Sequence, residues 1–396
     1  MSRRLLIINQ ALNLSFLKII EELASEFGEC ILITGSYLDS EREQLRIMHA
    51  PPHNPTTIIS RLKSWIQFIL FVLNSVRKNR LSFDLVFVTT NPPIAPFLAF
   101  FFKKIKNWPY ILLVWDIYPD IIEGSDRFKV FKPLFVLWRW LNGKVYKNAY
   151  VVITIGEKMA LTIRKQIPRL QFDIKIIPNC SDPIHIRPIP KEENWFAQRY
   201  NLTDKFVVLY SGKMGLSHDI ETILKAAKLL ASYEDIIFLF IGQGPGYNFI
   251  QEFIKRESLP NILLLPLQSD EVFPFSIAVG DIGIVSIQKG MENLMMPSKL
   301  YDMMAAGLAI IGISNGENDL RDTIERYNIG INEPSGDWEN LVKDIIFLKN
   351  NPEILSLYKR NSREALIKYF QISEIYKMFK KQFDAFGEKN LGEDGN

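Results

Sequence analysis

Residues 291–307 read Met-Glu-Asn-Leu-Met-Met-Pro-Ser-Lys-Leu-Tyr-Asp-Met-Met-Ala-Ala-Gly, and they say more about this chain than any other stretch. Pro297 ends what precedes it, Ser298 is typical of a helix N-cap, and Gly307 is typical of the residue after a helix. Lys299 places a positive charge in the first turn, where the helix dipole is already positive. A phosphate or diphosphate would make that position favourable. The alternative is an ordinary amphipathic helix with one misplaced lysine.

Two apolar runs flank this predicted helix. Residues 281–287 precede it and residues 308–313 follow it, and each run is typical of a buried strand. The helix therefore belongs to a strand–helix–strand unit, and its first turn lies at the carboxyl edge of a parallel sheet. Open α/β sheets bind their ligands at that edge.

The same alternation of apolar strands and helices continues along the chain. It predicts an α/β protein with two parallel sheets covered on both faces, which means two Rossmann-like domains facing across a cleft that holds the active site. The boundary lies in the proline-rich residues 182–200, so we expect domains at 1–185 and 200–371. The predicted strands are Leu5–Asn9, Cys30–Gly35, Leu85–Thr90, Tyr110–Asp116, Tyr150–Gly156 and Ile174–Pro178, then Phe206–Gly212, Ile236–Gly242, Ile262–Pro266, Asp281–Ile287, Ala309–Ile313 and Gly330–Glu333.

The composition is that of a large globular enzyme. The 396 residues are 47% hydrophobic and 23% charged, which suits two domains of ordinary size. The two cysteines, Cys30 and Cys180, are too few for a disulfide framework. The first apolar run, Leu5–Ile8, is too short for a signal peptide, and no stretch reaches the ~18 apolar residues of a spanning helix. These features predict a cytoplasmic protein.

Charge is distributed unevenly between the halves of the chain. Residues 1–190 hold 25 Lys and Arg against 15 Asp and Glu, whereas residues 191–396 hold 22 against 29. Within the basic half, residues 127–147 carry six cations and no acid, interleaved with aromatic side chains. This pattern predicts a surface that meets an anionic membrane. A solvated basic helix face is the alternative, and no motif favours a nucleic-acid partner.

With its flanks, the segment 291–307 resembles the C-terminal domain of family 4 glycosyltransferases. The resemblance is to the bacterial polysaccharide-biosynthesis branch that carries Pro-Ser-Lys-Leu-Tyr before an Ala-Ala-Gly turn, and it extends over most of the chain. The further stretches that fit in order are Thr-Thr-Asn-Pro-Pro (89–93), Trp-Asp-Ile-Tyr-Pro-Asp (115–120), Ile-Pro-Asn-Cys-Ser-Asp (177–182), Tyr-Ser-Gly-Lys-Met-Gly-Leu-Ser-His-Asp (210–219), Phe-Ile-Gly-Gln-Gly-Pro (240–245) and Leu-Leu-Pro-Leu-Gln (264–268).

This resemblance implies a GT-B fold, in which a C-terminal helix, here residues 372–386, packs back on the first domain. It implies a retaining transfer of a sugar from a nucleotide-diphosphate sugar, without a cofactor. It also implies a lipid-linked saccharide as the acceptor, in capsule, O-antigen or exopolysaccharide synthesis. The enzyme would then work as a peripheral protein on the inner face of the cell membrane.

The diphosphate site implied by the resemblance departs from the family pattern. The family uses a Gly-Arg-Leu loop followed five residues later by a lysine. Lys213 stands at the Arg position and His218 at the Lys position. Histidine is only partly charged near neutral pH, so Lys299 would restore the missing charge. The alternative for His218 is a histidine whose hydrogen bonds are satisfied within the core.

The family's pair of glutamates, eight residues apart, is also changed. Asp302 stands at the second position and would bind the hydroxyls of the nucleotide ribose. Leu294 stands at the first position and cannot contact the donor sugar as a glutamate does, whereas Glu292 is near enough to replace it. The remaining donor-binding candidates are Gly212, Gly242, Gly244, Leu267, Pro297 and Ser298.

Stabilisation of the leaving diphosphate is the central chemical requirement. The chain contains no Asp-x-Asp pair and no cluster with metal-ligand spacing, so we expect cations instead of a metal ion. Asp116 ends an apolar strand of the first domain. It would orient the acceptor hydroxyl or the donor sugar, or else cap the helix that follows. The predicted catalytic residues are Asp116, Lys213, His218 and Lys299.

Two other functions fit the same sequence. One is a nucleotide-sugar 2-epimerase on the same fold, which would turn over the donor without an acceptor. The other is a catalytically silent sugar-nucleotide-binding subunit. This alternative remains because Leu294 stands where the family has a glutamate. The sequence names neither the sugar and base of the donor nor the acceptor.

Overall fold

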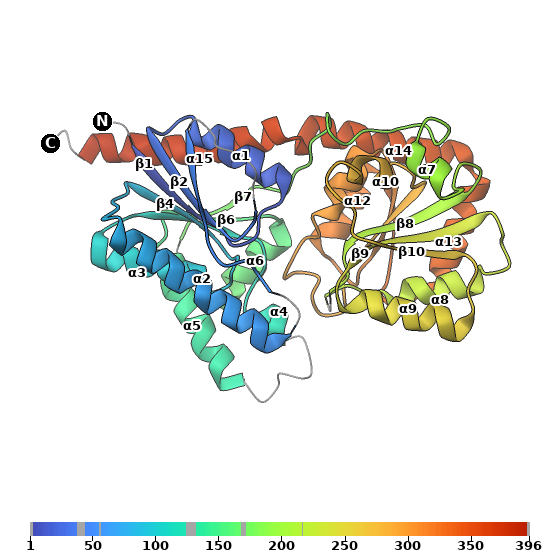
Figure 1. Cartoon of the computed structure of the whole chain (residues 1–396), viewed down its shortest axis with the longest axis horizontal. Coiled ribbons are helices and arrows are strands. Elements are labelled where there is room, and N and C mark those ends of the chain that lie inside the picture. Colours follow the sequence, from blue (N-terminus) through green and yellow to red (C-terminus); the bar gives the residue numbers. More distant parts are fainter. Residues whose placement is uncertain are drawn as a thin grey trace. The chain divides into compact units, whose positions relative to one another are not determined.

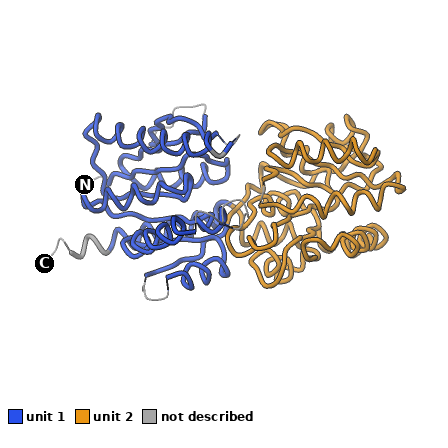
Figure 2. The backbone as a smooth tube through the Cα atoms, turned by 90° about the horizontal axis from the view of Figure 1, so that it is seen from below, with its two compact units in different colours: residues 1–178, 372–396 blue, residues 179–371 orange. Residues whose placement is uncertain are grey.

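The computed structural model describes residues 3–37, 44–54, 57–123, 132–167, 172–215 and 217–393. The chain divides into two compact units (Figure 2). Unit 1 comprises residues 1–178 and 372–396, and unit 2 comprises residues 179–371. Each unit is a parallel sheet with helices on both faces (Figure 1), as the continuous apolar runs predict.

Unit 1 is built on a sheet that, within the described residues, has the order β3-β2-β1-β4-β5-β6-β7. Its strands are β1 (Arg4–Ile8), β2 (Glu29–Thr34), β3 (Leu45–His49), β4 (Leu85–Thr89), β5 (Tyr110–Val114), β6 (Val151–Thr154) and β7 (Ile174–Ile176). Its helices are α1 (Leu14–Ala24), α2 (Ile58–Lys78), α3 (Ala95–Lys106), α4 (Asp120–Glu123), α5 (Lys132–Asn148), α6 (Glu157–Gln166) and α15 (Ile372–Glu393).

Helix α15, the last helix of the described chain, packs beside α1 in unit 1 (Figure 1). Aromatic side chains hold it there. The Phe379 ring lies 6.2 Å from Phe16 and 5.8 Å from Phe87 between centroids, and the Phe383 ring lies 5.9 Å from Phe27. Such pairs add to the area that the helix buries. The apolar face of α15 therefore belongs to the core of unit 1.

Unit 2 is built on a sheet that, in the described part of the chain, has the order β10-β9-β8-β11-β12-β13. Its strands are β8 (Phe206–Lys213), β9 (Ile236–Gln243), β10 (Ile262–Pro266), β11 (Ile282–Ser286), β12 (Ala309–Ile313) and β13 (Gly330–Glu333). Its helices are α7 (Trp195–Arg199), α8 (Glu221–Leu229), α9 (Pro245–Glu257), α10 (Phe273–Ile277), α11 (Lys299–Ala305), α12 (Asp319–Tyr327), α13 (Trp338–Asn350), α14 (Pro352–Ala365) and the π-helical turn η2 (Leu366–Phe370).

The strand order of unit 2 reverses between β8 and β11, which are direct neighbours. The loops that leave the carboxyl ends of these two strands therefore diverge, and such a switch point is where open α/β sheets bind ligands. Lys213 ends β8, and residues 287–298 connect β11 to α11. Of the sequence-predicted site residues, Gly212, Lys213 and Lys299 lie at this point.

Candidate active site

Lys299 reaches from the start of α11 to the carboxyl end of β8. Its Nζ lies 3.6 Å from the centroid of the Tyr210 ring and 3.5 Å from the carbonyl oxygen of Lys213. Gly212 has a φ of +119°, and a Cβ there would stand 3.5 Å from Lys299 Cε. The structure thus brings Gly212, Lys213 and Lys299 together, as the sequence predicts.

The ammonium group of Lys299 has no carboxylate partner among the described residues. Burial lowers its pKa well below the ordinary value for lysine. The Tyr210 ring offers a cation–π contact, which compensates only part of the lost hydration. An anion bound beside Lys299 would supply the missing counter-charge. Lys213 is exposed next to it and adds a second cation.

His218 is neutral. Its Nδ1 lies 2.9 Å from the carbonyl oxygen of Ser286, and a carbonyl only accepts, so Nδ1 carries the proton. Burial, together with the nearby charge of Lys299, lowers the pKa of His218 to about 3, while the hydrogen bond to Ser286 opposes this shift. The cations of the site are therefore Lys213 and Lys299, while His218 presents an uncharged ring beside them.

The start of α11 differs from the sequence prediction. Ser298 occupies the N-cap position, but its backbone already has helical dihedrals (φ −63°, ψ −25°) and its side chain makes no capping hydrogen bond. A capping side chain needs an extended backbone to reach the N–H groups of the first turn. The predicted N-cap role of Ser298 is therefore wrong. Gly307, with φ +70°, follows α11 in the left-handed conformation, as predicted.

Glu292 is buried and fully engaged with the protein. One carboxylate oxygen accepts the N–H of Gly290 at 2.7 Å, and the other accepts the side chain of Asn315 at 2.9 Å and its N–H at 3.3 Å. These bonds tie the loop before α11 to the turn after β12. Glu292 is thereby fixed in place at the same edge of the sheet as Lys299.

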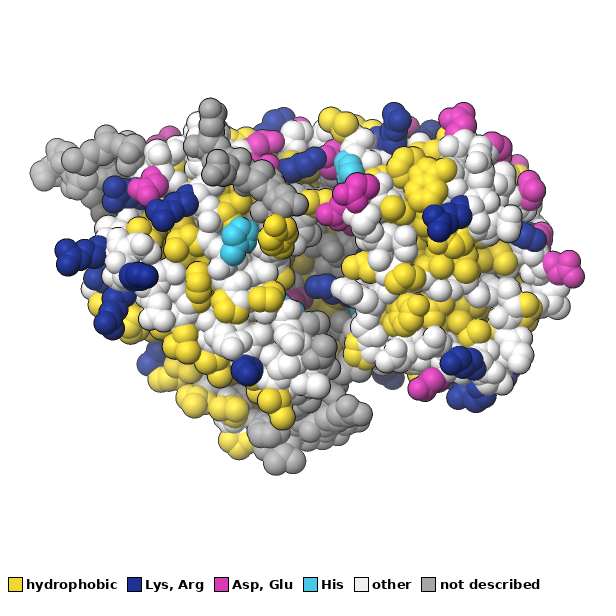
Figure 3. Space-filling view, in the orientation of Figure 1, with side chains coloured by type: hydrophobic (Ala, Val, Ile, Leu, Met, Phe, Trp, Pro, Cys, Tyr) yellow, Lys and Arg dark blue, Asp and Glu magenta, His cyan; other side chains and the backbone are white. Residues whose placement is uncertain are grey.

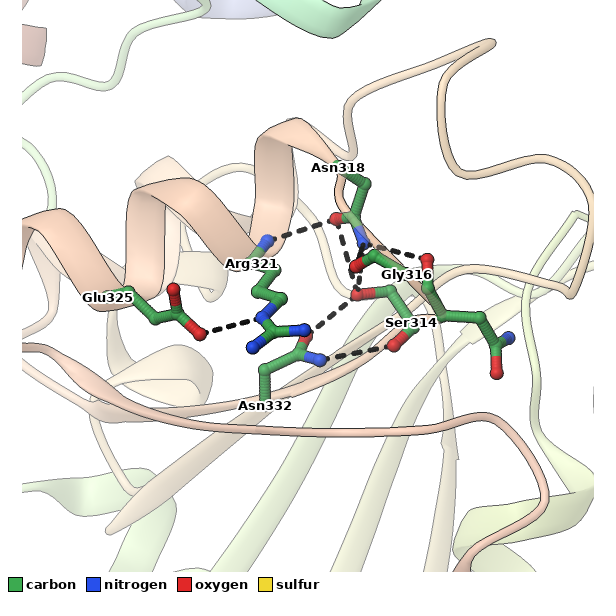
Figure 4. Close-up of polar contacts among 7 residues, drawn as sticks. Ser314, Gly316, Asn318, Arg321, Glu325 and Asn332 are labelled. Atoms are coloured by element: carbon green, nitrogen blue, oxygen red, sulfur yellow. Dashed lines mark hydrogen bonds and ion pairs between the residues drawn. The ribbon is translucent and has the colours of Figure 1, made fainter.

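A polar network continues from this turn (Figure 4). The Ser314 hydroxyl contacts Oδ1 of Asn332 at 2.7 Å and Oδ1 of Asn318 at 3.2 Å, and Asn318 caps α12 by accepting the N–H of Arg321 at 3.0 Å. Ser314 and Asn318 are completely or almost completely buried. A satisfied buried network of this kind holds one geometry. The sequence analysis missed these residues, although Ser and Asn directly after a strand were a readable signal.

Asp302 points from α11 toward the segment that enters unit 2. Its Oδ1 accepts the hydroxyl of Ser181 at 2.7 Å. Burial raises the pKa of Asp302 to about 7, and the Ser181 hydrogen bond opposes that rise. Burial thus moves the pKa of Asp302 from the ordinary range of a carboxyl group toward neutral pH.

The glycines of the β9 turn serve a close approach between backbones. A Cβ on Gly242 would stand only 1.9 Å from the carbonyl oxygen of Gly212. Gly244 has a φ of +121°, and a Cβ there would stand 2.8 Å from the carbonyl oxygen of Met214. Only glycine fits at either position. Leu267 lies farther along the edge, after β10, and its side chain is exposed.

Asp116 lies in unit 1, just after the carboxyl end of β5. Its N–H is 3.4 Å from Oγ1 of Thr90, and its charge, added to the effect of burial, raises the pKa of Tyr118. Helix α4 begins at Asp120, so Asp116 does not cap it. The alternative that Asp116 is a helix cap is therefore wrong.

The predicted membrane segment 127–147 is described only from Lys132 onward, and residues 127–131 lie outside the described residues. Within α5, Lys132, Lys144 and Lys147 are exposed. Arg139 is instead bonded to Asp120 at 3.0 Å and paired with Glu123. It is therefore not available to a membrane, and this part of the prediction needs correction.

Two general absences hold for the part of the chain that the structure describes. It contains no group of three or more His, Cys, Asp or Glu side chains able to hold a metal ion. None of its helices combines the length and the apolar character that a membrane span requires.

Comparisons with known proteins show what this chain is similar to. Residues 191–376 match the family model "Glycosyl transferases group 1". The chain is 26% identical over 333 residues to the probable glycosyltransferase WbjE of Pseudomonas aeruginosa, covering 81% of each protein. It is 33% identical over 104 residues to the putative colanic acid biosynthesis glycosyl transferase WcaI of Escherichia coli K12, covering 26% of this chain and 25% of WcaI.

The fold is also that of a solved structure, HepE of Anabaena in complex with UDP-glucose. The TM-score is 0.72 at 13% identity, covering 97% of this chain and all of HepE. Two parallel-sheet α/β units of this kind form the GT-B fold. Residues 191–376 thus resemble a glycosyl transferases group 1 domain, and the chain is a glycosyltransferase enzyme with a GT-B fold.

Proposed function

We propose that this enzyme transfers a sugar from a nucleotide-diphosphate sugar to a saccharide acceptor, and that Lys299 and Lys213 bind the diphosphate. The observation that carries the proposal is the ammonium group of Lys299, which lies against Tyr210 without a carboxylate partner among the described residues. A diphosphate beside it becomes more negative as the glycosidic bond breaks, so the same contact strengthens in the transition state. The solved complex of HepE with UDP-glucose supports a donor of this class.

Around the diphosphate, the other site residues take distinct roles. Asp302 accepts a hydroxyl of the nucleotide ribose, and Glu292 orders the loop before α11 and lies toward the donor sugar. His218, being neutral, packs beside the cations. The glycine turns of Gly212 and Gly242 keep the ends of β8 and β9 close together.

The transfer would need neither a metal ion nor another cofactor. Two lysines take the part that a divalent cation plays in metal-dependent transferases, because both neutralise charge on the leaving diphosphate. The described residues offer no cluster of metal-ligating side chains in support of the other route. Retention of the anomeric configuration rests on the family resemblance, and the anomer of the product, identified by NMR, tests it.

The acceptor that we propose is a lipid-linked saccharide in cell-surface polysaccharide synthesis, at the cytoplasmic face of the membrane. The similarity to WcaI, named for colanic acid biosynthesis, supports the pathway. Asp116, near the carboxyl end of β5, is placed to orient the acceptor hydroxyl from unit 1.

Three helices of unit 1 support an anionic membrane as the surface on which the enzyme works. α2, α3 and α5 contain no Asp or Glu and eleven Lys and Arg residues, of which Arg139 is paired with acids of α4. Hydrophobic side chains gather over α2 and α5 with cations beside them (Figure 3). Both helices contact Tyr118, through Trp65 and Trp138. The exposed apolar side chains are Ile59, Leu62, Ile66 and Leu70 on α2 and Leu134, Val136, Leu137 and Trp140 on α5. Cations attract anionic headgroups, and apolar side chains enter the interface.

A two-step experiment tests the proposed function. Thermal shift with UDP-, GDP- and ADP-sugars identifies the donor, because a ligand of the folded state raises the melting temperature. The chosen donor is then incubated with the enzyme, with and without membrane lipids that carry saccharides. We expect release of the nucleoside diphosphate only when an acceptor is present. Conversion of the donor to another nucleotide sugar without an acceptor would indicate a 2-epimerase.

A further inference from the structure

The segment that enters unit 2 makes a direct contact with α11. Ser181 is completely buried, and its hydroxyl donates to Oδ1 of Asp302 at 2.7 Å. Its N–H donates to the carbonyl oxygen of Phe370 at 3.2 Å, and Ser181 forms a parallel bridge with Gln371, the last residue of unit 2. Ser181 thus has one fixed position, next to a carboxylate of the candidate site.

The surroundings hold Ser181 and α11 together as one body. The guanidinium group of Arg363, on α14, donates to the carbonyl oxygens of Pro183 at 2.7 Å and Ile186 at 2.9 Å, in the entering segment. The same group donates to the carbonyl oxygen of Ala305, in the last turn of α11, at 2.5 Å. One partly buried cation therefore links the segment to the helix that carries Asp302. Arg363 therefore holds both the segment that contains Ser181 and the helix that contains Asp302, which fixes the distance between these two side chains.

The contact with Ser181 uses only one of the two oxygens of the Asp302 carboxylate. The structure records no second hydrogen bond to this carboxylate from the described residues. A carboxylate accepts hydrogen bonds at both oxygens, so Oδ2 retains its capacity as an acceptor. Asp302 is only partly buried, so Oδ2 is open to a ligand. The hydroxyl of Ser181 orients the carboxylate and so determines where Oδ2 points.

We propose that Ser181 is a positioning residue for the donor nucleotide. Its hydroxyl holds Oδ1 of Asp302 and so leaves Oδ2 to accept a hydrogen bond from the ribose. This inference rests on the proposed function, in which Asp302 contacts the ribose. The pattern Asn-Cys-Ser-Asp (179–182) did not single out Ser181 in the sequence, because its partner lies 121 residues away.

The test compares a ribonucleoside diphosphate with its 2′,3′-dideoxy counterpart. The probes are UDP and 2′,3′-dideoxy-UDP, or the equivalent pair for GDP or ADP if that base binds more tightly. Calorimetry gives both dissociation constants, and their ratio is the ribose preference. We expect wild type to prefer the ribonucleotide by about tenfold, as one hydrogen bond to a charged group would give. Ser181→Ala should reduce this preference at least threefold and leave the affinity for the dideoxy compound unchanged.

Matched variants separate positioning from a general loss of structure. Ser276→Ala removes another completely buried serine hydroxyl of unit 2 and should leave the ribose preference unchanged. Ser181→Cys retains a weak donor of similar size and should fall between wild type and Ser181→Ala. It also replaces Ser181→Ala as the test if that variant does not fold. Binding of the dideoxy compound reports on the fold in every case.

A pH series gives a second readout that a purely structural role would not produce. Ribose binding needs ionised Asp302, so the preference is present above the pKa of Asp302 and lost as the pH falls through it. Removing the Ser181 hydroxyl raises that pKa, so the loss should begin at higher pH in Ser181→Ala. The titratable groups nearby are Cys180, Asp182 and Arg363. Burial raises the pKa of Cys180 to about 12, so its thiol stays neutral in this range.

The outcomes distinguish this inference from the function on which it rests. If Asp302→Asn leaves the ribose preference unchanged, Asp302 does not contact the ribose and that part of the proposed function is wrong. If Asp302→Asn abolishes the preference while Ser181→Ala and Ser181→Cys both retain it, the positioning role of Ser181 is overturned and the proposed function stands.

Discussion

Replacing Lys299 by methionine removes the charge that we assign to the diphosphate while keeping the length of the side chain. Methionine also retains contact with the Tyr210 ring, because its thioether packs well on aromatic faces. The substitution should therefore leave the backbone at Gly212 and Lys213 undisturbed. We expect weaker nucleoside-diphosphate binding together with an intact fold.

The magnitude follows from the surroundings of the ammonium group. Two unit charges about 4 Å apart at an effective dielectric constant near 20 attract each other by about 4 kcal/mol. Part of that energy is lost because the anion gives up hydration, and the cation–π contact of about 0.5–2 kcal/mol weakens as Nζ turns toward the anion. A net loss of about 2–3 kcal/mol remains, which corresponds to a dissociation constant about 30- to 150-fold higher.

The stability of the unliganded protein gives a second, opposite signature. Burial lowers the pKa of Lys299 in the folded state, so the folded chain binds fewer protons at this site than the unfolded chain. The site therefore costs stability below its unfolded pKa of 10.5, and this cost shrinks as the pH rises toward that value. Lys299→Met should abolish the cost, so the variant should melt at an equal or higher temperature than wild type near neutral pH.

Calorimetric titration with the nucleoside diphosphate, alongside thermal melts at pH 7 and pH 9, measures both effects. Lys289→Met is the matched control, because Lys289 is exposed in the loop that leads to the same helix. It should change neither the affinity nor the melting temperature. Wild-type affinity in a folded Lys299→Met variant would refute the assignment of Lys299 to the diphosphate.

Three further predictions follow from the same structure. Sugar transfer should survive an excess of EDTA, and restoration by Mg²⁺ or Mn²⁺ of an activity lost to EDTA would contradict the role of the lysines. Gly242→Ala should destabilise unit 2 by more than about 4 kcal/mol, because its Cβ would stand 1.9 Å from the carbonyl oxygen of Gly212; a urea midpoint equal to that of wild type would show that the two turns separate easily. Replacing Lys132, Lys144 and Lys147 by Gln should make the free energy of binding to vesicles that contain phosphatidylglycerol less favourable by about 1 kcal/mol per lysine at low salt, as measured by sedimentation. The matched control replaces Lys255, Lys289 and Lys343 of unit 2, and equal losses in both triple variants would exclude a surface specific to α5.

Strands were predictable where both faces of the sheet are covered, because nearly every residue of such a strand is then apolar. The run at 309–313, in which every residue is buried, is a strand with the predicted bounds. β3, Leu45–His49, escaped the sequence analysis. It is an edge strand whose Arg46 and His49 are exposed, so it shows no continuous apolar run.

The site was predictable only as far as single residues carry their own chemistry. Lys299 stood out because a cation in a first helical turn needs an explanation. Its contact with Tyr210 joins residues 89 positions apart, and no local pattern reports such a distance. Ser298 failed as a cap because its backbone is already helical, and residue type alone does not predict those dihedrals. Arg139 looked like a free cation because its partners Asp120 and Glu123 lie on another helix.

A crystal structure with the nucleoside diphosphate, grown in the presence of EDTA, tests the central claim most directly. The account predicts a β-phosphate oxygen within hydrogen-bond distance of Lys299 Nζ, with the ammonium group turned away from the Tyr210 ring and no metal between phosphate and protein. A diphosphate bound elsewhere on unit 2, or bound only when a divalent ion bridges it to carboxylates, would contradict the account.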